Sequence, residues 1–449
     1  MPVVTGRLAL AAVLAAGLAL VLPLPTFPAL LVLNGGLLLV AAVDWALATK
    51  PERFTVEREL PGIVPLGGEA TLTWWVRNPA RRANRVRLAD ELVPSLGAGT
   101  RRARLTVPAS GRASARTTLH PSRRGRFSPD NVTLRVAGPL GLAARQRRLR
   151  VPGSLRVYPP FHSRDEAELR INKARILEVG LRSAQGRGGG TEFDSLREYG
   201  LDDEFRRIDW AATARAGKPI VRTYRAERNQ TVLLLLDAGR TMAGKVELPA
   251  GVHVPDQGKL PGVPRLDHAM DAVMMLTAVA TRLGDRAGLV AFDDRVRAVV
   301  PPGHTRDQLS RVTEAMYALE PALVESDYRG AFAETLARFR RRAMLVIYTE
   351  LAAEAVSETL LPALPLIARD HIVVVASVTD PQVAAWARAV PTDAGSAYRK
   401  AAAVTALSER RRTVARLRAL GATVVDAEPG QLAPRLADAY LKVKATGRL

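Results

Sequence analysis

The sequence predicts an α/β domain with a doubly wound parallel sheet, preceded by a β-sandwich and by a transmembrane hairpin of two helices. Three observations lead to this fold class. Residues 8–43 carry no charge, residues 54–160 contain short β-favouring runs between turn residues, and the C-terminal half alternates apolar strands with amphipathic helices. A chain of 449 residues is long enough for two or three domains. We place their boundaries at 1–53, 54–160, 161–230 (a connecting region) and 231–449.

The first 53 residues read as two membrane spans. Leu8–Leu24 and Phe27–Leu47 each come close to the roughly 20 apolar residues that cross a hydrocarbon core. Prolines at positions 23, 25 and 28 suit a tight turn between the two spans. A cleaved signal peptide is the alternative, and the second apolar span that follows directly argues against it.

Charges beside the spans predict their orientation. Arg7 precedes the first span, Lys50 and Arg53 follow the second, and the turn between them has no basic residue. Because basic flanks stay in the cytoplasm, we expect both termini on the cytoplasmic side of the inner membrane.

The positive charge of the chain is concentrated next to these spans. The net charge is +21, and residues 54–160 hold 20 arginines against 6 acidic residues. Anionic lipids attract nearby basic residues by about 1 kcal/mol each. We therefore expect residues 54–160 to contact anionic lipids of the inner leaflet. No nucleic-acid motif accompanies the charge, so a nucleic-acid partner is not expected.

Residues 54–160 are predicted to form an antiparallel sandwich that acts as a spacer or binding module. On one strand, the Trp74–Trp75 pair should place one ring inside and the other outside, because side chains alternate between faces. The predicted strands are Ala70–Arg77, Arg85–Leu88, Arg102–Val107, Ala113–Leu119, Val132–Val136 and Leu155–Tyr158.

The C-terminal domain is predicted from its alternating pattern. Thr231–Leu236 is apolar after its first residue, which is typical of a strand covered on both faces. Further strands are expected at Ala287–Phe292, Ala343–Tyr348, Ile372–Val378 and Ala422–Val425. Helices are expected at Leu266–Leu283, Arg306–Leu319, Tyr328–Arg341, Val404–Leu420 and Gln431–Lys444.

Oxygen-bearing side chains follow several of these strands. Asp237 and Thr241 follow the first strand, and Thr349 and Glu350 follow the third. Because ligands bind at the carboxyl ends of parallel strands, and Mg²⁺ and Ca²⁺ prefer oxygen ligands, these residues are candidates for a metal site. The alternative is that such residues cap helices.

Capping is the preferred interpretation for Ser326 and Asp327, just before the Tyr328 helix. The loop Ala243–Pro264 allows two interpretations, a mobile lid over this rim or a disordered insertion. The chain has no cysteine, and its six histidines form no helical pair, which excludes thiolate sites and disfavours histidine metal sites.

A charged signature, Gly190–Lys218, precedes the first strand of this domain. Its balanced charges suit an ion-pair network that bridges the domains, or else a surface that docks a partner. Catalysis ranks last because the signature has no histidine and no nucleophile set. The candidate docking residues are Arg197, Asp203, Arg206, Arg207, Asp209, Trp210 and Arg215.

Several motifs together resemble a known family. The signature (TEFDSLREY followed by RRIDWAATAR), LDHAMDA at 266–272 and GDRAGLVAFDD at 284–294 are similar to the domain-of-unknown-function 58 family. The pattern Asp237-x-Gly239-x-Thr241 resembles the metal-ion-dependent adhesion site of von Willebrand factor A domains. That site uses DxSxS, a distant threonine and a late aspartate.

The resemblance implies a von Willebrand A-like fold and a partner of the MoxR-type AAA+ ATPase class. It also implies a degenerate Mg²⁺ or Ca²⁺ site at Asp237, Thr241 and Glu350, because Gly239 replaces the first serine and Glu350 the late aspartate.

We therefore expect a membrane-anchored interaction or scaffold protein that works with a MoxR-type ATPase in assembling or maturing other proteins. The alternative is a metal-dependent hydrolase at the strand-end rim. It lacks a visible base or nucleophile, so we do not expect an enzyme.

Overall fold

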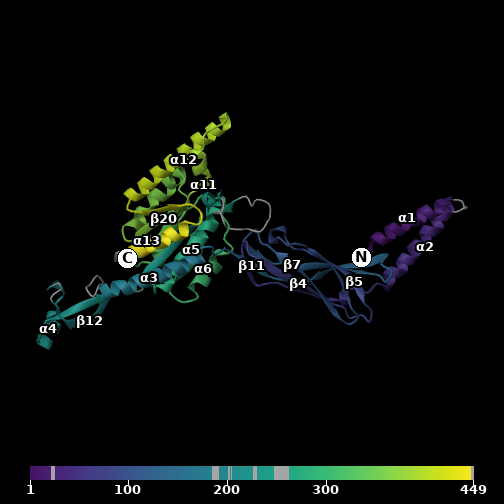
Figure 1. Cartoon of the computed structure of the whole chain (residues 1–449), viewed down its shortest axis with the longest axis horizontal. Coiled ribbons are helices and arrows are strands. Elements are labelled where there is room, and N and C mark those ends of the chain that lie inside the picture. Colours follow the sequence, from purple (N-terminus) through teal and green to yellow (C-terminus); the bar gives the residue numbers. More distant parts are fainter. Residues whose placement is uncertain are drawn as a thin grey trace. The chain divides into compact units, whose positions relative to one another are not determined.

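The computed structural model divides the chain into two units, Met1–Tyr158 and Pro159–Leu449 (Figure 1). It describes residues 1–21, 26–184, 192–200, 203, 205–225, 230–246 and 262–445. Each unit is considered by itself below.

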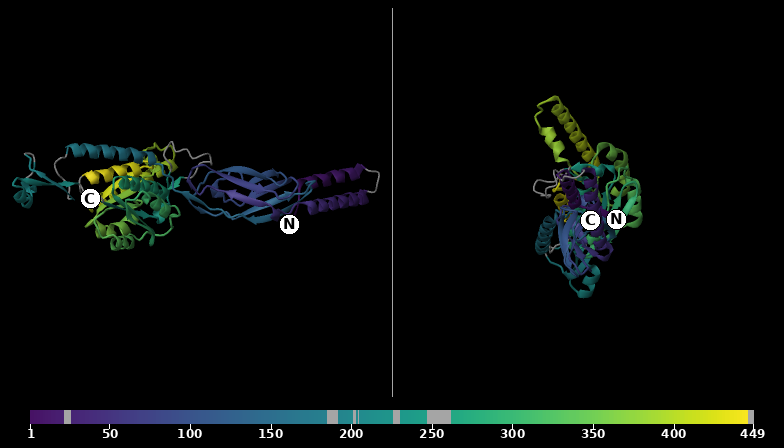
Figure 2. Two further views of the ribbon diagram at one scale, coloured as in Figure 1. Left: turned by 90° about the horizontal axis from the view of Figure 1, so that it is seen from below. Right: turned by 90° about the vertical axis from the view of Figure 1, so that its right-hand side faces the viewer.

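Both apolar stretches near the N-terminus are helical. Helix α1 (Gly6–Val21) has 16 residues and helix α2 (Thr26–Leu47) has 22, and the two run side by side (Figure 2). At 1.5 Å per residue, α2 spans about 33 Å and α1 about 24 Å. Of the described helices, one is long and apolar enough to cross a bilayer, and it is the one that begins at Phe27.

Both helices are attached to the same loop of the following β-domain. Asp44, 1% exposed near the end of α2, accepts hydrogen bonds from the backbone N–H groups of Leu140, Leu142 and Ala143 at 2.8–2.9 Å. The Thr5 hydroxyl, just before α1, donates to the carbonyl of Leu142 at 2.9 Å. A carboxylate that accepts hydrogen bonds from three backbone N–H groups makes strong, charge-assisted hydrogen bonds, so the C-terminal end of α2 is fixed to this loop.

The β-domain is built from three sheets around one core. The prediction of purely antiparallel pairing is wrong for Ile63–Pro65 and Leu155–Tyr158, which pair in parallel. A five-stranded sheet has the order β1-β10-β9-β5-β6, and its neighbours are antiparallel. Two three-stranded sheets have the orders β2-β4-β7 and β3-β11-β8. The strand bounds are β1 (Pro2–Val4), β2 (Thr55–Glu59), β3 (Ile63–Pro65), β4 (Ala70–Arg77), β5 (Asn84–Asp90), β6 (Arg102–Val107), β7 (Arg112–Leu119), β8 (Gly125–Phe127), β9 (Asn131–Ala137), β10 (Ala143–Arg150) and β11 (Leu155–Tyr158).

The tryptophan pair on β4 alternates as predicted. Trp74 is fully buried in the core, where its Nε1 donates to Asp90 Oδ2 at 2.6 Å. Trp75 faces outward under the Arg112 guanidinium, whose Cζ lies 4.9 Å from the ring centroid. Period-two alternation therefore places the core of this domain correctly.

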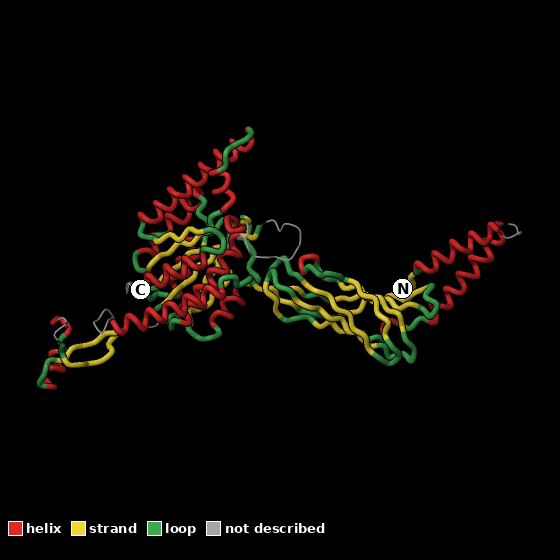
Figure 3. Tube along the Cα trace, in the orientation of Figure 1, coloured by secondary structure: helices red, strands yellow, loops and turns green. Residues whose placement is uncertain are grey.

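The second unit centres on a six-stranded sheet with the order β18-β17-β14-β19-β20-β21. Figure 3 shows strands in yellow among red helices in this unit. Its strands are parallel except for β18, which pairs antiparallel with β17 at the edge. The mixed α/β class is therefore confirmed. The strands are β14 (Thr231–Asp237), β17 (Arg286–Phe292), β18 (Val296–Gly303), β19 (Met344–Tyr348), β20 (Ile372–Val378) and β21 (Thr423–Ala427).

Helices cover both faces of this sheet. Val232, Leu234 and Leu236 of β14 join one buried cluster, while Leu233 and Leu235 join a separate one on the opposite face. The first cluster includes residues of α3 (Arg164–Ala184), α5 (Arg265–Arg282), α6 (Gln308–Met316) and α13 (Leu432–Ala445). The second includes residues of α7 (Tyr328–Arg338), α10 (Pro365–Ala368) and α12 (Ala394–Ala419).

The signature lies in a separate small element, which we call the signature ribbon (residues 192–225). Strands β12 (Glu192–Glu198) and β13 (Ile220–Arg225) form a two-stranded antiparallel sheet, and helix α4 (Trp210–Ala216) lies between them in the chain. The Ala243–Pro264 loop falls mostly outside the described residues. Its two ends pair as β15 (Lys245–Val246) and β16 (Val263–Pro264).

Candidate functional site at the strand-end rim and the signature ribbon

Asp237 ends the central strand at the point where the strand order reverses. Strand β14 has β17 on one side and β19 on the other, and both are parallel to it. In open parallel sheets, the connections diverge at such a point and leave a crevice at the carboxyl ends of the strands. The sequence therefore located the rim of the sheet correctly.

The Asp237 carboxylate is enclosed by protein donors. Its exposure is 0%, and its Oδ1 accepts from the backbone N–H of Gly239 at 2.8 Å and from the Ser326 hydroxyl at 2.5 Å. Its Oδ2 lies 2.7 Å from the hydroxyls of both Tyr328 and Thr349. Both carboxylate oxygens are thus satisfied inside the protein.

Ser326 occupies the space next to Gly239. A Cβ atom at Gly239 would collide with the Ser326 hydroxyl oxygen, so this hydroxyl occupies the space that a side chain at position 239 would need. A hydroxyl from a loop 89 residues after Asp237 therefore fills the space beside this glycine. The prediction that Ser326 caps a helix is wrong, whereas Asp327 does cap α7 by accepting from Gly330 N at 2.9 Å.

Burial keeps Tyr328 in its donor form. Burial raises the pKa of the Tyr328 hydroxyl well above its usual range, and the charge of Asp237 raises it further. The ring packs edge-on against Phe292, with centroids 5.4 Å apart, which fixes the direction of the hydroxyl.

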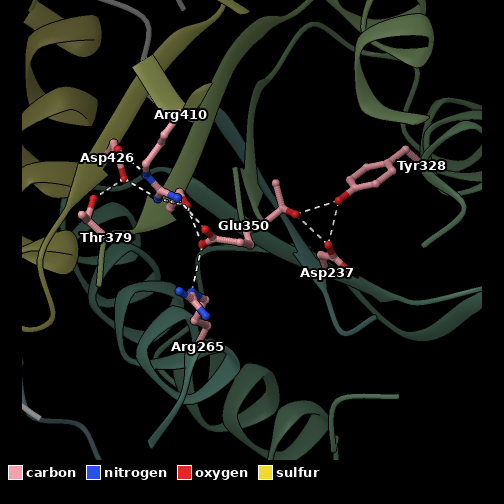
Figure 4. A network of polar contacts seen from close by, with 9 residues as sticks. Asp237, Arg265, Tyr328, Glu350, Thr379, Arg410 and Asp426 are labelled. Atoms are coloured by element: carbon pink, nitrogen blue, oxygen red, sulfur yellow. Dashed lines mark hydrogen bonds and ion pairs between the residues drawn. The ribbon is translucent and has the colours of Figure 1, made fainter. Parts of the chain in front are cut away.

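Glu350 points away from Asp237 into a second polar cluster (Figure 4). Its Oε1 lies 2.5 Å from Arg410 Nη1, and its Oε2 lies 3.0 Å from Arg265 Nε. Arg410 also reaches Asp426 with Nε at 2.8 Å and Nη2 at 2.7 Å. Burial works to lower the pKa of the Arg410 guanidinium, but Asp426 and Glu350 outweigh it and raise the pKa.

The predicted metal ligands are not arranged as a cation site. The Asp237 oxygens are occupied by four protein groups, and two guanidinium groups hold the Glu350 carboxylate. The Thr241 hydroxyl makes no hydrogen bond to either carboxylate. A divalent cation needs carboxylate oxygens free to bind it and would be repelled by the two arginines. These residues therefore do not fit Mg²⁺ or Ca²⁺ as they stand, and the metal site stays an untested prediction.

His268, on the α5 helix beside this rim, makes stability depend on pH. Burial lowers its pKa to about 4, and its buried Nε2 has no hydrogen-bond partner among the described residues. The unfolded chain then binds more protons than the folded one between pH 4 and pH 6.5, so stability falls as the pH drops through this window. We expect wild type to lose about 1–2 kcal/mol between pH 7.5 and pH 5 relative to His268→Gln.

The measurement is denaturant unfolding of the full chain in detergent at both pH values. Burial raises the pKa of Asp271, which acts in the opposite direction, but Asp271 is present in both proteins and cancels in the comparison. Equal pH slopes for wild type and His268→Gln would contradict this assignment.

The charged residues of the signature ribbon bind one another. Arg197 forms two hydrogen bonds to Asp203, at 2.7 and 2.5 Å. Asp209 caps α4 by accepting from two backbone N–H groups at 3.0 Å, and its other oxygen accepts from Arg222 Nε at 2.6 Å. The N–H group of Ala212, the Arg222 hydrogen bond and the other nearby donors lower the pKa of Asp209. The predicted ion-pair network thus exists, but its described pairs lie within the ribbon.

Two aromatic residues of the ribbon are exposed, whereas its Ala212, Ile220 and Val221 are buried. Phe205 is 67% and Trp210 62% exposed, and their rings meet edge-on with centroids 5.6 Å apart. Arg215 folds back on its own helix, donating to the Ala211 carbonyl at 3.2 Å. Arg206 is exposed, and the side chain of Arg207 lies outside the described part of the chain. The exposed aromatic pair is therefore the most prominent contact surface of the ribbon.

Sequence reasoning missed two contributors to these sites, Tyr328 and Phe205, and assigned a third, Ser326, to helix capping instead. Ser326 and Tyr328 come from a distant loop and helix start, and Phe205 was passed over in favour of its charged neighbours. The available signal for Ser326 was the glycine at position 239, which leaves room beside Asp237 for a side chain from elsewhere in the chain. For Phe205, the signal was an aromatic residue with no apolar periodicity around it.

Comparisons with known proteins agree with the resemblance in part. The model of a family described as a protein of unknown function, DUF58, matches residues 195–252 and 256–393, which is most of the C-terminal region. No curated protein matches the chain.

Similar solved structures share little sequence with this chain. One is a protein of unknown function from Porphyromonas gingivalis W83, with 19% identity over 24% of this chain and 48% of that chain and a TM-score of 0.19. Another is the CARDB domain of PF1109 from Pyrococcus furiosus, with 15% identity over 22% of this chain and 94% of that chain and a TM-score of 0.15. A third, an uncharacterized membrane spanning protein from Vibrio fischeri, has 16% identity over 47% of this chain and 96% of that chain and a TM-score of 0.19.

Proposed function

We propose that this protein is a membrane-anchored, von Willebrand A-like scaffold that docks a MoxR-type AAA+ ATPase through its signature ribbon. In this proposal the complex assembles or matures other proteins at the inner membrane. The observation that carries it is the exposed Phe205–Trp210 pair on a ribbon in which Arg197 pairs with Asp203 and Arg222 with Asp209. Large exposed aromatic side chains held rigidly in place are typical anchors of protein interfaces.

The topology of the second unit supports the von Willebrand A-like part of the proposal. Its central strand ends in an aspartate at the switch point of a parallel sheet, with a threonine after the neighbouring strand in hydrogen-bond contact. Asp237 and Thr349 thus meet at the carboxyl ends of neighbouring strands. The role we assign to this cluster is to hold the rim rigid.

The anchoring of the helices supports a hairpin with both ends on one side of the membrane. The start of α1 and the end of α2 contact the same loop, so the two helices leave the β-domain together. Helix α2 is long enough to cross alone, while α1 would need the bilayer to thin locally or flanking residues to reach the headgroups. The cytoplasmic placement of both termini rests on the basic flanks described above.

The alternative, a metal-dependent hydrolase, has weaker support. A hydrolase of that class needs a metal with an open position and a nearby base. The Glu350 carboxylate is held by two arginines, and Asp237 is fully buried. We therefore propose that the protein binds a partner rather than hydrolysing a substrate.

Docking is tested with the purified full chain in detergent and the purified MoxR-type ATPase of the same genome. We expect Phe205→Ala/Trp210→Ala to weaken binding by at least about tenfold, since central aromatic anchors each contribute ~2 kcal/mol or more. Because both rings are exposed, the variant should fold normally, which circular dichroism checks.

The matched control is Tyr398→Ala, which removes an aromatic ring that is 79% exposed on α12. It should leave ATPase binding unchanged. Undiminished binding by the Phe205/Trp210 variant would place the docking surface elsewhere, and failure of wild type to bind would reject the ATPase partner.

A further inference from the structure

The outer face of the five-stranded sheet carries a row of arginines that the sequence pattern does not reveal. Arg104 of β6 lies directly opposite Arg87 of β5, and Arg87 lies directly opposite Arg135 of β9. The next position in the row, on β10, is Gln146. Three arginines on three adjacent strands thus stand side by side.

More basic residues surround this row on the same face. Arg85 and Arg102 lie two positions away on β5 and β6, and side chains two apart share a face. In the described part of the chain, neither of them nor any arginine of the row has an ion pair. On this face, Arg148 does have one, with the exposed Glu91. We call the five arginines 85, 87, 102, 104 and 135 the arginine face.

Such an arrangement costs stability unless an anion is bound. Like charges directly opposite each other on neighbouring strands repel, and no described carboxylate pairs with these arginines. Arg135 is also held in place, because its Nε and Nη2 donate to Gln146 Oε1 at 3.0 and 2.7 Å. A row of guanidinium groups suits phosphate groups, which arginine binds with two hydrogen bonds.

The arginine face lies close to the C-terminal end of helix α2, and this position favours phospholipid headgroups as the source of the phosphate. Strand β5 begins at Asn84, whose side chain accepts a hydrogen bond from Thr49, two residues after α2 ends. At about 3.4 Å per residue, Arg87 lies roughly 10 Å along the strand from this contact. The headgroup layer extends about 5–7 Å beyond the hydrocarbon core, and its field reaches a further ~8–10 Å. The row therefore lies within the field of the headgroups.

The C-terminal end of α2 has other features that are typical of a membrane interface. Trp45 lies there, with the Arg145 guanidinium 4.3 Å from its ring centroid, and tryptophan is enriched at headgroup level. Arg145 Nε also donates to the Trp45 carbonyl at 3.0 Å, which places a cation at the helix C-terminus. A second basic residue, Arg82, contacts the Leu47 carbonyl.

We propose that the arginine face is a binding surface for anionic phospholipid headgroups, centred on Arg87, Arg104 and Arg135. This inference rests on the membrane anchoring in the proposed function and narrows its lipid contact to one face of one sheet. An acidic protein or RNA would have to approach a face that lies beside the bilayer, which favours the lipid.

The test uses the full chain in nonionic detergent with equimolar phosphatidylglycerol and phosphatidylcholine, and native mass spectrometry counts the lipids retained. Wild type should retain phosphatidylglycerol in excess. Arg87→Gln/Arg104→Gln/Arg135→Gln should reduce that excess by at least about tenfold at low salt. The control, Arg101→Gln/Arg116→Gln/Arg126→Gln, removes the same charge from exposed positions outside the row and should keep the preference.

A second measurement shows that the variant is folded. Because removing like charges relieves repulsion, the row variant without lipid should melt at the same temperature as wild type or above it. Added phosphatidylglycerol should then raise the melting temperature of wild type more than that of the row variant.

The outcomes are separable. If the row variant keeps its phosphatidylglycerol preference, the arginine face is overturned while membrane anchoring stands. If wild type retains neither lipid, the anchoring itself fails and the inference with it. A third outcome is that an RNA oligonucleotide binds the arginine face while the row variant keeps the phosphatidylglycerol selectivity of wild type. In that case the arginine face is an RNA-binding surface and the lipid assignment is wrong.

Discussion

Asp90→Ala is expected to destabilise the β-domain by about 3–5 kcal/mol, because it leaves a buried arginine without its counter-charge. The side chains of Arg58 and Asp90 both have 0% exposure. Arg58 binds Asp90 through Nε at 2.8 Å and Nη2 at 2.6 Å, and Nη1 donates to the Val151 carbonyl at 2.6 Å. The guanidinium group thus connects β2, the end of β5 and the residue after β10.

The loss has two physical parts. The unpaired guanidinium cannot reach water without opening the core, and the Trp74 indole N–H loses the acceptor it has at 2.6 Å. Removing one partner of a buried pair costs far more than the net stabilisation that the pair contributes, because the remaining charge keeps its desolvation penalty. We therefore expect Arg58→Met/Asp90→Leu to recover much of the stability that Asp90→Ala loses.

The measurement is denaturant unfolding of the full chain, followed by tryptophan fluorescence, since Trp74 reports on this core. Glu91→Ala is the matched control, because the neighbouring carboxylate pairs with Arg148 at the surface, where the two side chains are 42% and 61% exposed. An exposed pair contributes at most ~1 kcal/mol. Equal losses for the two variants would show that the Arg58–Asp90 pair is not buried in solution.

The fold was predictable wherever local pattern determines structure. Strands β4, β6, β11 and β20 have the bounds that the sequence predicts, because each combines apolar alternation or an apolar run with turn residues. Strand β10 was missed because AARQRRLR has no apolar alternation, and β18 because two prolines interrupt it. Both are edge or near-edge strands whose place is set by a neighbour rather than by their own residues.

The sites were predictable only in part, because they join residues that are far apart in the chain. The sequence located Asp237 and Glu350 at the rim but not the direction of the Glu350 side chain, which contacts Arg410, 60 residues further along the chain. The basic excess of residues 54–160 was visible in the composition. Its concentration on one face required the register of β5, β6 and β9.

Asp237→Asn is expected to destabilise the α/β domain by about 3 kcal/mol, and Asp237→Ala by about 3–5 kcal/mol. On the Oδ1 side, the amide nitrogen of asparagine would face the backbone N–H of Gly239, which can only donate. On the Oδ2 side, the Tyr328 and Thr349 hydroxyls would have to accept instead of donate, and the neutral amide gives up the charge-assisted hydrogen bonds of the carboxylate. The alanine variant removes the acceptor of all four groups in a site with no access to water. Unfolding of the full chain in detergent measures both losses.

The control is Asp327→Asn, which changes the same residue type one loop away. Asp327 caps α7 from an exposed position, and asparagine caps helices about as well as aspartate, so the cost should stay below ~0.5 kcal/mol. Comparable losses at positions 237 and 327 would contradict the buried cluster.

The same variants separate a structural cluster from a metal site. If the cluster is held by hydrogen bonds alone, Mg²⁺ and chelator leave the stability of wild type unchanged, and the loss in Asp237→Asn is the same with and without the ion. If Asp237 binds a cation, Mg²⁺ stabilises wild type by an amount that grows with its concentration, and Asp237→Asn abolishes that gain.

Gly239→Ser should also be destabilising, because its Cβ would displace Ser326, and Gly239→Ser/Ser326→Gly should relieve the collision. Mg²⁺ stabilisation that appears only in this double variant would mean that Ser326 has taken the place of the lost serine and closed the site to metal.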